Sequence, residues 1–175
     1  PNKILLFNPR SSNGKYRIPN SILQVGASIY GKYDFVCVDG NIEQDPWQII
    51  KSYFDSGEFS YFCCTVMPGP QLRQAIPFTK KIKALFPNCI TIWGGYFPSN
   101  QFKVCINASY VDYIVDGPGD ATFPSLITTL ENNNLSHLKQ IKNLIYLDYK
   151  GDITKTPKEA LLDQDSLPPL PYTHL

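Results

Sequence analysis

Two adjacent glycines, Gly94 and Gly95, directly follow an apolar run at residues 89–93, and a glycine-bearing turn at residues 117–120 follows the next apolar run. In parallel α/β sheets, ligands bind outside the carboxyl ends of the strands. Residues without side chains at that edge let a bulky group come close to the backbone. We therefore predict that both turns belong to one ligand-binding edge.

Two other strand ends are expected in register with this edge. Asp39 and Asn41 follow the apolar run at residues 35–38, and a further run that starts at residue 61 ends in Thr65, Val66 and Met67. These side chains are small, polar or flexible. Their types indicate that the edge binds a ligand and carries no acid–base pair, so we predict no catalytic residue here.

The loop after the first apolar run matches no common phosphate-binding motif. Residues 8–15 contain a single glycine and fit neither GxGxxG nor GxxxxGK[ST]. The hydroxyl and amide groups of this loop could hold a phosphate as an FMN-binding loop does. A flavodoxin-like FMN protein is therefore one alternative for this chain.

Composition indicates one ordinary globular domain. The chain has 175 residues, of which 43% are hydrophobic and 18% charged, and its net charge is +1. The near-neutral charge argues against nucleic acid as a partner. No apolar stretch is long enough to span a membrane, and no signal peptide opens the sequence. The five cysteines are odd in number and lack CxxC spacing, which predicts neither disulfides nor a metal or iron–sulfur site. Because the cysteines are expected to stay reduced, we expect a cytoplasmic protein.

Strand-like and helix-like segments alternate along the first part of the chain. Short apolar runs, which do not alternate strictly, are typical of strands buried on both faces. They occupy residues 3–7, 35–38, 61–66, 89–93 and 111–115. Helical stripes lie between them, with Asp45 and Asp120 as candidate caps and Pro77 expected to kink or shorten one helix. We predict a doubly wound α/β fold with a mainly parallel five-stranded sheet in the flavodoxin-like order 2-1-3-4-5.

The pattern changes after the polar stretch at residues 131–134. Segments 144–147 and 152–154 flank Lys150 and Gly151, which predicts a β-hairpin. Residues 163–175 contain three prolines and are typical of an extended connector. We therefore divide the chain into an α/β domain at 1–135 and a hairpin with a connector at 136–175, and we expect another domain to follow.

The order of these edge residues resembles the cobalamin-binding fold, whose pattern is Asp-x-His-x-x-Gly, then Ser-x-Leu, then Gly-Gly. Thr65-x-Met67 and Gly94-Gly95 are similar to the last two elements. The resemblance implies a groove beside Thr65 and Gly94 that takes the nucleotide tail of cobalamin once the tail leaves the cobalt. Asn41 stands in place of the cobalt-binding histidine. Binding without a histidine lower ligand is therefore implied.

A narrower resemblance is to the N-terminal cobalamin-binding domain of B12-dependent radical SAM enzymes. It spans almost the whole chain, and the matching segments are residues 3–9, 18–19, 38–39, 94–99, 111–120 and 165–171. The implied cofactor-binding residues are Asn8, Pro9, Asp39, Asn41, Thr65, Val66, Met67, Gly94, Gly95, Tyr96, Phe97, Pro98, Gly117, Gly119 and Asp120. The implied partners are cobalamin and a radical SAM domain of the same polypeptide.

The same resemblance implies the chemistry of the parent protein. S-adenosylmethionine and a [4Fe-4S] cluster would bind only in the missing domain, and the reaction would be methyl transfer or a cobalamin-assisted radical rearrangement. Phe97 replaces the family's histidine, and Pro118 replaces a glutamate. These two departures support an alternative, a cofactor-free recognition or scaffold domain of the same fold.

Overall fold

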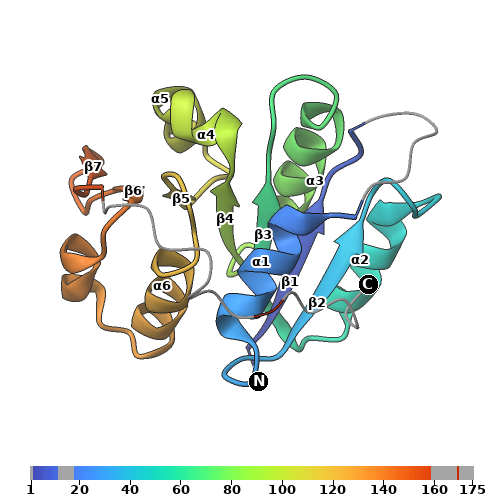
Figure 1. Ribbon diagram of the computed structural model, residues 1–175, viewed down its shortest axis with the longest axis horizontal. Helices are drawn as coiled ribbons and strands as arrows, with labels where there is room; N and C mark the ends of the chain where they lie inside the picture. The colour runs from blue at the N-terminus through green and yellow to red at the C-terminus, as the bar shows by residue number, and fades with distance from the viewer. Residues whose placement is uncertain (1, 12–17, 159–168, 170–175) are drawn as a thin grey trace.

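The computed structural model describes residues 2–11, 18–158 and 169. Its centre is one seven-stranded sheet in the order β2-β1-β3-β4-β5-β6-β7 (Figure 1). The strands are β1 (Lys3–Asn8), β2 (Phe35–Asp39), β3 (Phe59–Thr65), β4 (Ile90–Gly94), β5 (Tyr113–Val115), β6 (Leu144–Leu147) and β7 (Ile153–Lys155). The first five are parallel, and their predicted order is confirmed.

The predicted count of five strands was too low for this sheet. The hairpin forms as expected, but β6 pairs antiparallel with β5, so β6 and β7 extend the same sheet. Strand pairing of this kind is not encoded in the local pattern of residues 144–155. It depends on the free edge that β5 offers.

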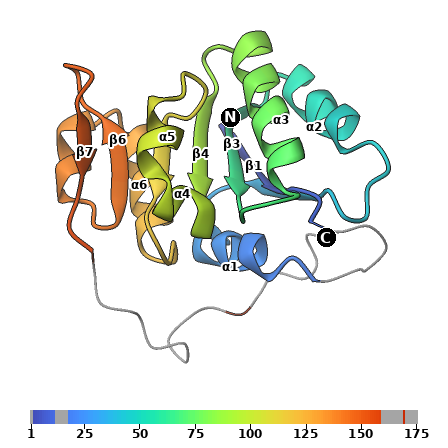
Figure 2. The same ribbon diagram turned by 90° about the horizontal axis from the view of Figure 1, so that it is seen from above.

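Helices cover both faces of the sheet, as Figure 2 shows for α1 on one side and α2 and α3 on the other. The helices are α1 (Asn20–Ile29), α2 (Pro46–Asp55), α3 (Leu72–Leu85), α4 (Tyr96–Asn100), α5 (Phe102–Asn107) and α6 (Thr122–Glu131), with a 3₁₀ helix, η1, at Leu135–Gln140. Buried side chains of α1 and α6 pack with Leu6 and Ile92, whereas those of α2, α3 and α5 pack with Leu5 and Phe7. Alternation along each strand thus divides the core into two layers.

The predicted helix caps are confirmed at α2 but not at α6. Asp45 caps α2 as predicted, since its Oδ1 accepts a hydrogen bond of 3.2 Å from the Gln48 amide. Asp120 does not cap α6: the residue at the cap position is Ala121, and its side chain makes no capping bond. The α3 helix continues through Pro77. Pro19 lies at the cap position of α1 and not in its first turn.

The connection from β4 to β5 contains two short helices that the sequence analysis did not identify. Tyr96, Phe97 and Pro98 belong to α4, and α5 follows after a single residue. Both helices are too short to show a clear periodic stripe. Within the described residues, no helix has the length and apolar character needed to cross a membrane.

Candidate functional site

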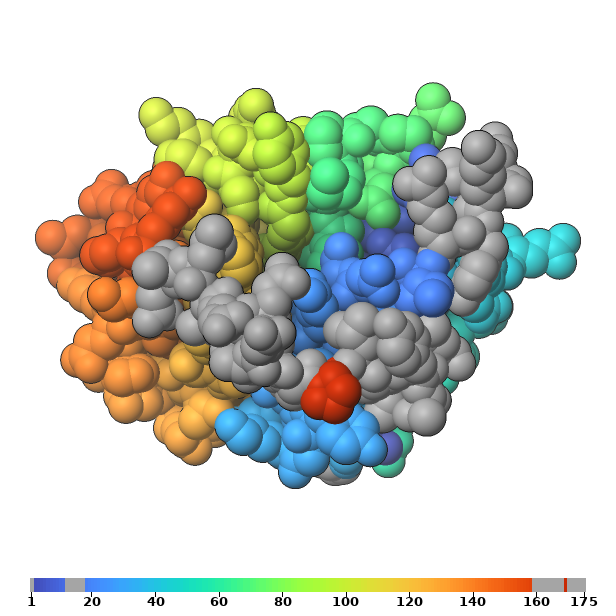
Figure 3. Space-filling model, viewed as in Figure 1, coloured from blue at the N-terminus to red at the C-terminus, as the bar shows by residue number. Residues whose placement is uncertain are grey.

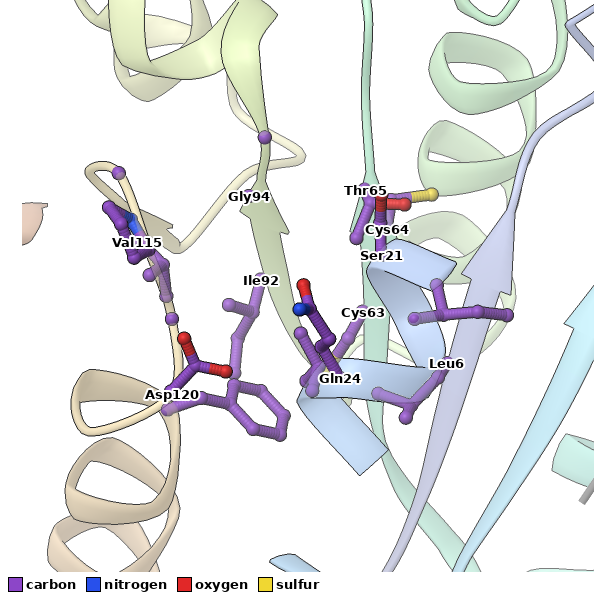
Figure 4. A pocket seen from close by; sticks show the side chains of 17 residues that line it. Leu6, Ser21, Gln24, Cys63, Cys64, Thr65, Ile92, Gly94, Val115 and Asp120 are labelled. Carbon is purple, nitrogen blue, oxygen red and sulfur yellow. The ribbon is translucent and has the colours of Figure 1, made fainter. Parts of the chain in front are cut away.

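A cavity of about 530 Å³ opens between α1 and the first turn of α6, over the carboxyl halves of the central strands. Its volume lies within the range of small-molecule pockets, about 300–1,000 Å³. We call it the α1–α6 cavity. Seventeen residues line it: Leu6, Ser21, Ile22, Gln24, Val25, Cys63, Cys64, Thr65, Ile92, Gly94, Gly95, Val115, Gly117, Pro118, Gly119, Asp120 and Phe123. Figure 4 shows the cavity from close by.

The floor of the cavity is built by strand register. Leu6 pairs with Cys63, and Cys63 pairs with Ile92, so these three side chains form one row across β1, β3 and β4. One step toward the carboxyl edge, Thr65 pairs with Gly94. Parallel pairing puts paired residues on the same face. The small residue in the second row leaves the space above the first row open.

Gly94 and Gly95 have different structural roles. A Cβ placed on Gly94 would meet only Val115 Cβ, at 3.8 Å, so the position is open. A Cβ on Gly95 would lie 2.9 Å from the Val66 carbonyl oxygen, and Gly95 has φ 100° and ψ −175°. That backbone conformation is essentially restricted to glycine. Gly94 therefore keeps the cavity open, and Gly95 allows the chain to turn sharply after β4.

Polar groups lie at the mouth and wall of the cavity. Ser21 and Gln24 come from the exposed side of α1, and Asp120 precedes α6 on the opposite wall. Figure 4 shows the Gln24 and Asp120 side chains pointing into the space between these two helices. Burial raises the pKa of the Asp120 carboxyl above its ordinary value. These groups offer both donors and acceptors to a polar part of a ligand.

The turn after β5 is tied to the turn after β4. The Gly117 amide donates to Ser99 Oγ at 3.0 Å, and Ser99 Oγ donates to the Gly95 carbonyl at 2.8 Å. Gly117 has φ 97°, and no atom lies within 4 Å of the place of its missing Cβ. The two glycine turns therefore form one continuous edge. That this edge binds a ligand stays a prediction.

Two exposed apolar side chains stand at the same edge. Met67 is 51% exposed and Tyr96 is 61% exposed. The Phe97 amide donates to the Val66 carbonyl at 3.0 Å, which joins the segments after β3 and β4. Figure 3 shows these segments, in green and yellow-green, side by side along one edge of the face that carries α1. Phe97 is half-buried against the core of the α2 and α3 face, and Pro98 is buried.

Four other predicted residues, Asn8, Pro9, Asp39 and Asn41, lie at the ends of β1 and β2, outside the lining of the α1–α6 cavity. Asn8 Nδ2 donates to Asp39 Oδ1 at 3.1 Å, and the Asn41 amide donates to the same oxygen at 3.0 Å. Asn41 Oδ1 accepts from the Ser11 amide at 2.9 Å. This polar cluster holds the loops after β1 and β2 together. A cofactor-binding role for these four residues stays a prediction.

Gln71 joins this polar cluster to the end of β3, and the sequence analysis missed it. Its Nε2 donates to Asn8 Oδ1 at 3.1 Å and to the Pro9 carbonyl at 2.8 Å, and its Oε1 accepts from the Met67 amide at 2.8 Å. Gln71 is only 5% exposed. A buried glutamine with both ends bonded orders the edge beside the cavity.

No model of a known protein family matches the chain. Two curated relatives are anaerobic magnesium-protoporphyrin IX monomethyl ester cyclases. The one from Synechocystis sp. is 31% identical over 85 residues, 48% of this chain, and the one from Cereibacter sphaeroides is 26% identical over 102 residues, 57% of this chain. The matched region spans 17% of each relative's length.

Solved structures resemble nearly the whole chain. The cobalamin-dependent S-adenosylmethionine radical enzyme OxsB, with aqua-cobalamin and S-adenosylmethionine bound, superposes with a TM-score of 0.77 at 20% identity and covers 91% of this chain. The radical S-adenosylmethionine methyltransferase TsrM from Kitasatospora setae, with cobalamin and a [4Fe-4S] cluster bound, gives 0.75 at 17% identity and covers 96%. This chain has the fold of one part of such enzymes. It spans 22% of the OxsB chain and 31% of the TsrM chain, and the resemblance stated from the sequence is confirmed at the level of the fold.

Of the fifteen predicted site residues, six line the α1–α6 cavity: Thr65, Gly94, Gly95, Gly117, Gly119 and Asp120. The sequence analysis did not identify the α1 wall or the apolar floor. Ser21 and Gln24 lie on the polar side of a helical stripe, and such residues look like ordinary solvent-facing positions. The spacing of Leu6, Cys63 and Ile92 indicates buried strands but does not show that a cavity lies above them.

The cysteines are not arranged for metal binding. All five are free, and burial raises the pKa of the Cys37 thiol to about 12 and that of Cys105 to about 11. Neutral thiols are poor metal ligands. Within the described part of the chain, no three histidine, cysteine or acidic side chains are grouped as metal ligands.

Proposed function

We propose that this chain is a cobalamin-binding module of a larger radical SAM enzyme. It takes the nucleotide tail of cobalamin into the α1–α6 cavity, with the tail base displaced from the cobalt and no histidine lower ligand. The observation that carries the proposal is the open space above Gly94, at the place where the Gly-Gly motif of the cobalamin-binding fold predicts a groove. The bound state of OxsB and TsrM supports it by analogy.

The residues present suit such a ligand. The apolar floor would hold the flat base, because burying aromatic surface away from water stabilises the complex. Ser21, Gln24 and Thr65 would donate hydrogen bonds to the phosphate, and the Asp120 carboxyl would bind hydroxyl groups of the sugar. Met67 and Tyr96 are exposed at the edge, where they would contact the corrin ring. When bound, cobalamin supplies a cobalt centre for methyl transfer or radical rearrangement.

The module would act together with a separate catalytic domain. We propose that residues 1–135 form the cobalamin-binding unit and that residues 136–175 lead from the hairpin to a radical SAM domain, which holds S-adenosylmethionine and a [4Fe-4S] cluster. The proline-rich connector falls at residues 163–175, and of these only residue 169 lies in the described part. Methyl transfer is the proposed reaction of the whole protein.

A direct binding experiment tests the proposal. The chain is mixed with hydroxocobalamin, desalted and examined by visible spectroscopy, and the mixture is also brought to equilibrium by dialysis. We expect retained cobalamin with the spectrum of the form whose base has left the cobalt. Equal cobalamin concentrations on both sides of the dialysis membrane would reject the proposal, because dialysis also detects weak complexes that desalting loses.

A cofactor-free scaffold domain is the second candidate, and one observation favours it. Phe97, which replaces the family's histidine, packs against the core and offers no polar group to a cofactor. The same dialysis experiment separates the two functions. The FMN alternative depended on the loop at residues 8–15, of which residues 12–15 lie outside the described part.

A further inference from the structure

We infer that the α1–α6 cavity selects the base of the nucleotide tail, taking a methylated benzimidazole in preference to a purine. The inference rests on the proposed function and deepens it. Cobamides share the corrin ring and differ in this base. The chemistry of the cavity floor therefore decides which cobamide the chain binds best.

The floor of the cavity and the adjoining parts of α1 and α6 are apolar. Leu6 and Ile22 are each 1% exposed, and Ile92 and Phe123 are each 2% exposed. Val115 adds a further aliphatic wall at 5% exposure. All five side chains lack a hydrogen-bonding group. A polar base that reached this floor would lose its water without gaining partners.

Cys63, the cysteine in the same strand row as Leu6 and Ile92, does not make the floor polar. It is 6% exposed, and burial raises the pKa of its thiol well above the ordinary value of 9.0. A neutral buried thiol behaves as a small hydrophobic group with a weak donor. It offers little to an amino group or a ring nitrogen.

The backbone beneath the floor is also occupied. Strands β1, β3 and β4 pair with one another through the rows that carry Leu6, Cys63 and Ile92. At the edge, the Gly94 carbonyl accepts from the Val66 amide at 2.8 Å. Amides and carbonyls committed to the sheet are not available to a ligand base.

The polar side chains of the cavity lie away from the floor. Ser21 and Gln24 are exposed on α1, and Thr65 and Asp120 are partly exposed near the carboxyl edge. The hydroxyl and amide groups can donate to a phosphate, and the carboxyl can bind a sugar hydroxyl, at the mouth of the cavity. The base is then left to the apolar floor. Adenine carries an amino group and several ring acceptors, which would be buried without partners at a cost in free energy. Burial of the two methyl groups of dimethylbenzimidazole at the same floor would instead strengthen binding.

Comparing three corrinoids tests the inference on the unmodified chain. Isothermal titration or dialysis gives the dissociation constants of cobalamin, the adenine-containing cobamide and cobinamide, which has no nucleotide tail. We expect cobalamin to bind at least about tenfold more tightly than the adenine form, about 1.4 kcal/mol, and cobinamide to bind more weakly than cobalamin. Equal affinity for the two cobamides would overturn the base selection while the proposed function stands. Failure of all three to bind would reject the proposed function itself.

A pair of cysteine variants locates the selection at the floor. Cys63→Ser puts a hydroxyl beside the ligand base with little change in size, and we expect it to narrow the preference for cobalamin about threefold. Cys105→Ser is the matched control, because Cys105 is buried in the core of the opposite face and does not line the cavity. We expect its preference to equal that of the unmodified chain. An unchanged preference in Cys63→Ser would contradict the role of the floor.

Discussion

Thr65 and Gly94 lie opposite each other in the parallel pairing of β3 with β4, and both line the α1–α6 cavity. Thr65 places a hydroxyl at the cavity, whereas Gly94 has no side chain and leaves the space beside it open. The strand pairing keeps them adjacent without any contact between side chains. The cavity therefore depends on which residue type occupies one position of β4.

The Gly94→Leu substitution should fill the cavity without unfolding the chain. A Cβ at this position meets only Val115 Cβ, so the leucine side chain would extend into the open space. We expect cobalamin binding to be lost, while the free energy of unfolding changes by less than about 1 kcal/mol. Dialysis and chemical denaturation measure the two effects. Gln48→Leu, on an exposed position of α2, is the control and should bind normally. Unchanged cobalamin affinity in Gly94→Leu would contradict the proposed site.

The Gly95→Ala substitution should instead destabilise the fold. The residue has φ 100° and ψ −175°, and its new Cβ would lie 2.9 Å from the Val66 carbonyl oxygen. Backbone strain of this kind costs about 1–3 kcal/mol. Gly57→Ala is the control, because Gly57 also has a positive φ, 78°, but no atom lies within 4 Å of its missing Cβ. Urea denaturation should show a larger loss for Gly95→Ala, and equal losses would contradict the role of the Val66 contact.

The Asp120→Asn substitution should change the pH dependence of stability. Burial raises the pKa of the Asp120 carboxyl in the folded chain above the ordinary 3.8, so its ionisation disfavours the folded state. This residue's contribution is most favourable below pH 3.8 and is lost as the pH rises through the raised pKa. The asparagine variant, which stays neutral, should therefore melt above the unmodified chain at neutral pH, and the difference should shrink toward pH 3.8. Melting curves across this range check the sign. A variant that melts lower at neutral pH would contradict it.

Lys155 and Lys158 both lie near the buried Asp116 carboxylate, and we expect either lysine alone to be enough to stabilise its charge. The Asp116 side chain is fully buried, and its oxygens lie 3.8 Å from Lys155 Nζ and 3.5 Å from Lys158 Nζ. Neither oxygen accepts a hydrogen bond from the described residues. We expect Lys155→Gln or Lys158→Gln alone to cost less than about 1 kcal/mol. The double variant should cost about 3 kcal/mol, because it leaves a buried charge without a cation.

A background variant makes this lysine experiment decisive. In Asp116→Asn the buried charge is gone, so replacing both lysines should have little further effect on the free energy of unfolding. Denaturation of the unmodified chain, the double lysine variant, Asp116→Asn and the triple variant completes the cycle. Additive single effects in the unmodified background would contradict the redundancy of the two lysines. An equal loss on replacing both lysines in Asp116→Asn would show that they act independently of Asp116.

The stability of the fold should depend on the Thr79 hydroxyl, which accepts a hydrogen bond from the buried indole of Trp93. Trp93 is 1% exposed, and its Nε1 donates to Thr79 Oγ1 at 3.1 Å. Thr79→Val keeps the shape but leaves the indole N–H without an acceptor, which costs about 1–3 kcal/mol. Thr79→Ser retains the hydroxyl and should be less affected. Chemical denaturation, monitored by tryptophan fluorescence, gives the free energy of unfolding of both variants. An unchanged value in Thr79→Val would contradict the role of the Thr79 hydroxyl.

The sequence alone determined the five parallel strands and the edge that is predicted to bind a ligand. Buried strands have short apolar runs, and helices have periodic stripes, so the positions of the first five strands along the chain followed from local patterns. Their order in the sheet followed from the doubly wound fold class that the alternation of strands and helices indicates. The cap at Asp45 and the glycine turn after β4 were also readable, because each depends on neighbouring residues in the chain. The resemblance carried by Thr65, Met67 and the two glycines indicated the fold of the solved structures.

The tertiary structure decided which of these residues act together. In the folded chain there is room for a side chain at Gly94, whereas a side chain at Gly95 would clash with the Val66 backbone. The sequence shows only two identical residues and cannot reveal this difference. Packing also brought Gln24 of α1 opposite Asp120, more than ninety positions along the chain, and joined Gln71 to Asp39 through Asn8. Such arrangements depend on contacts between distant segments, and local propensity carries no information about them.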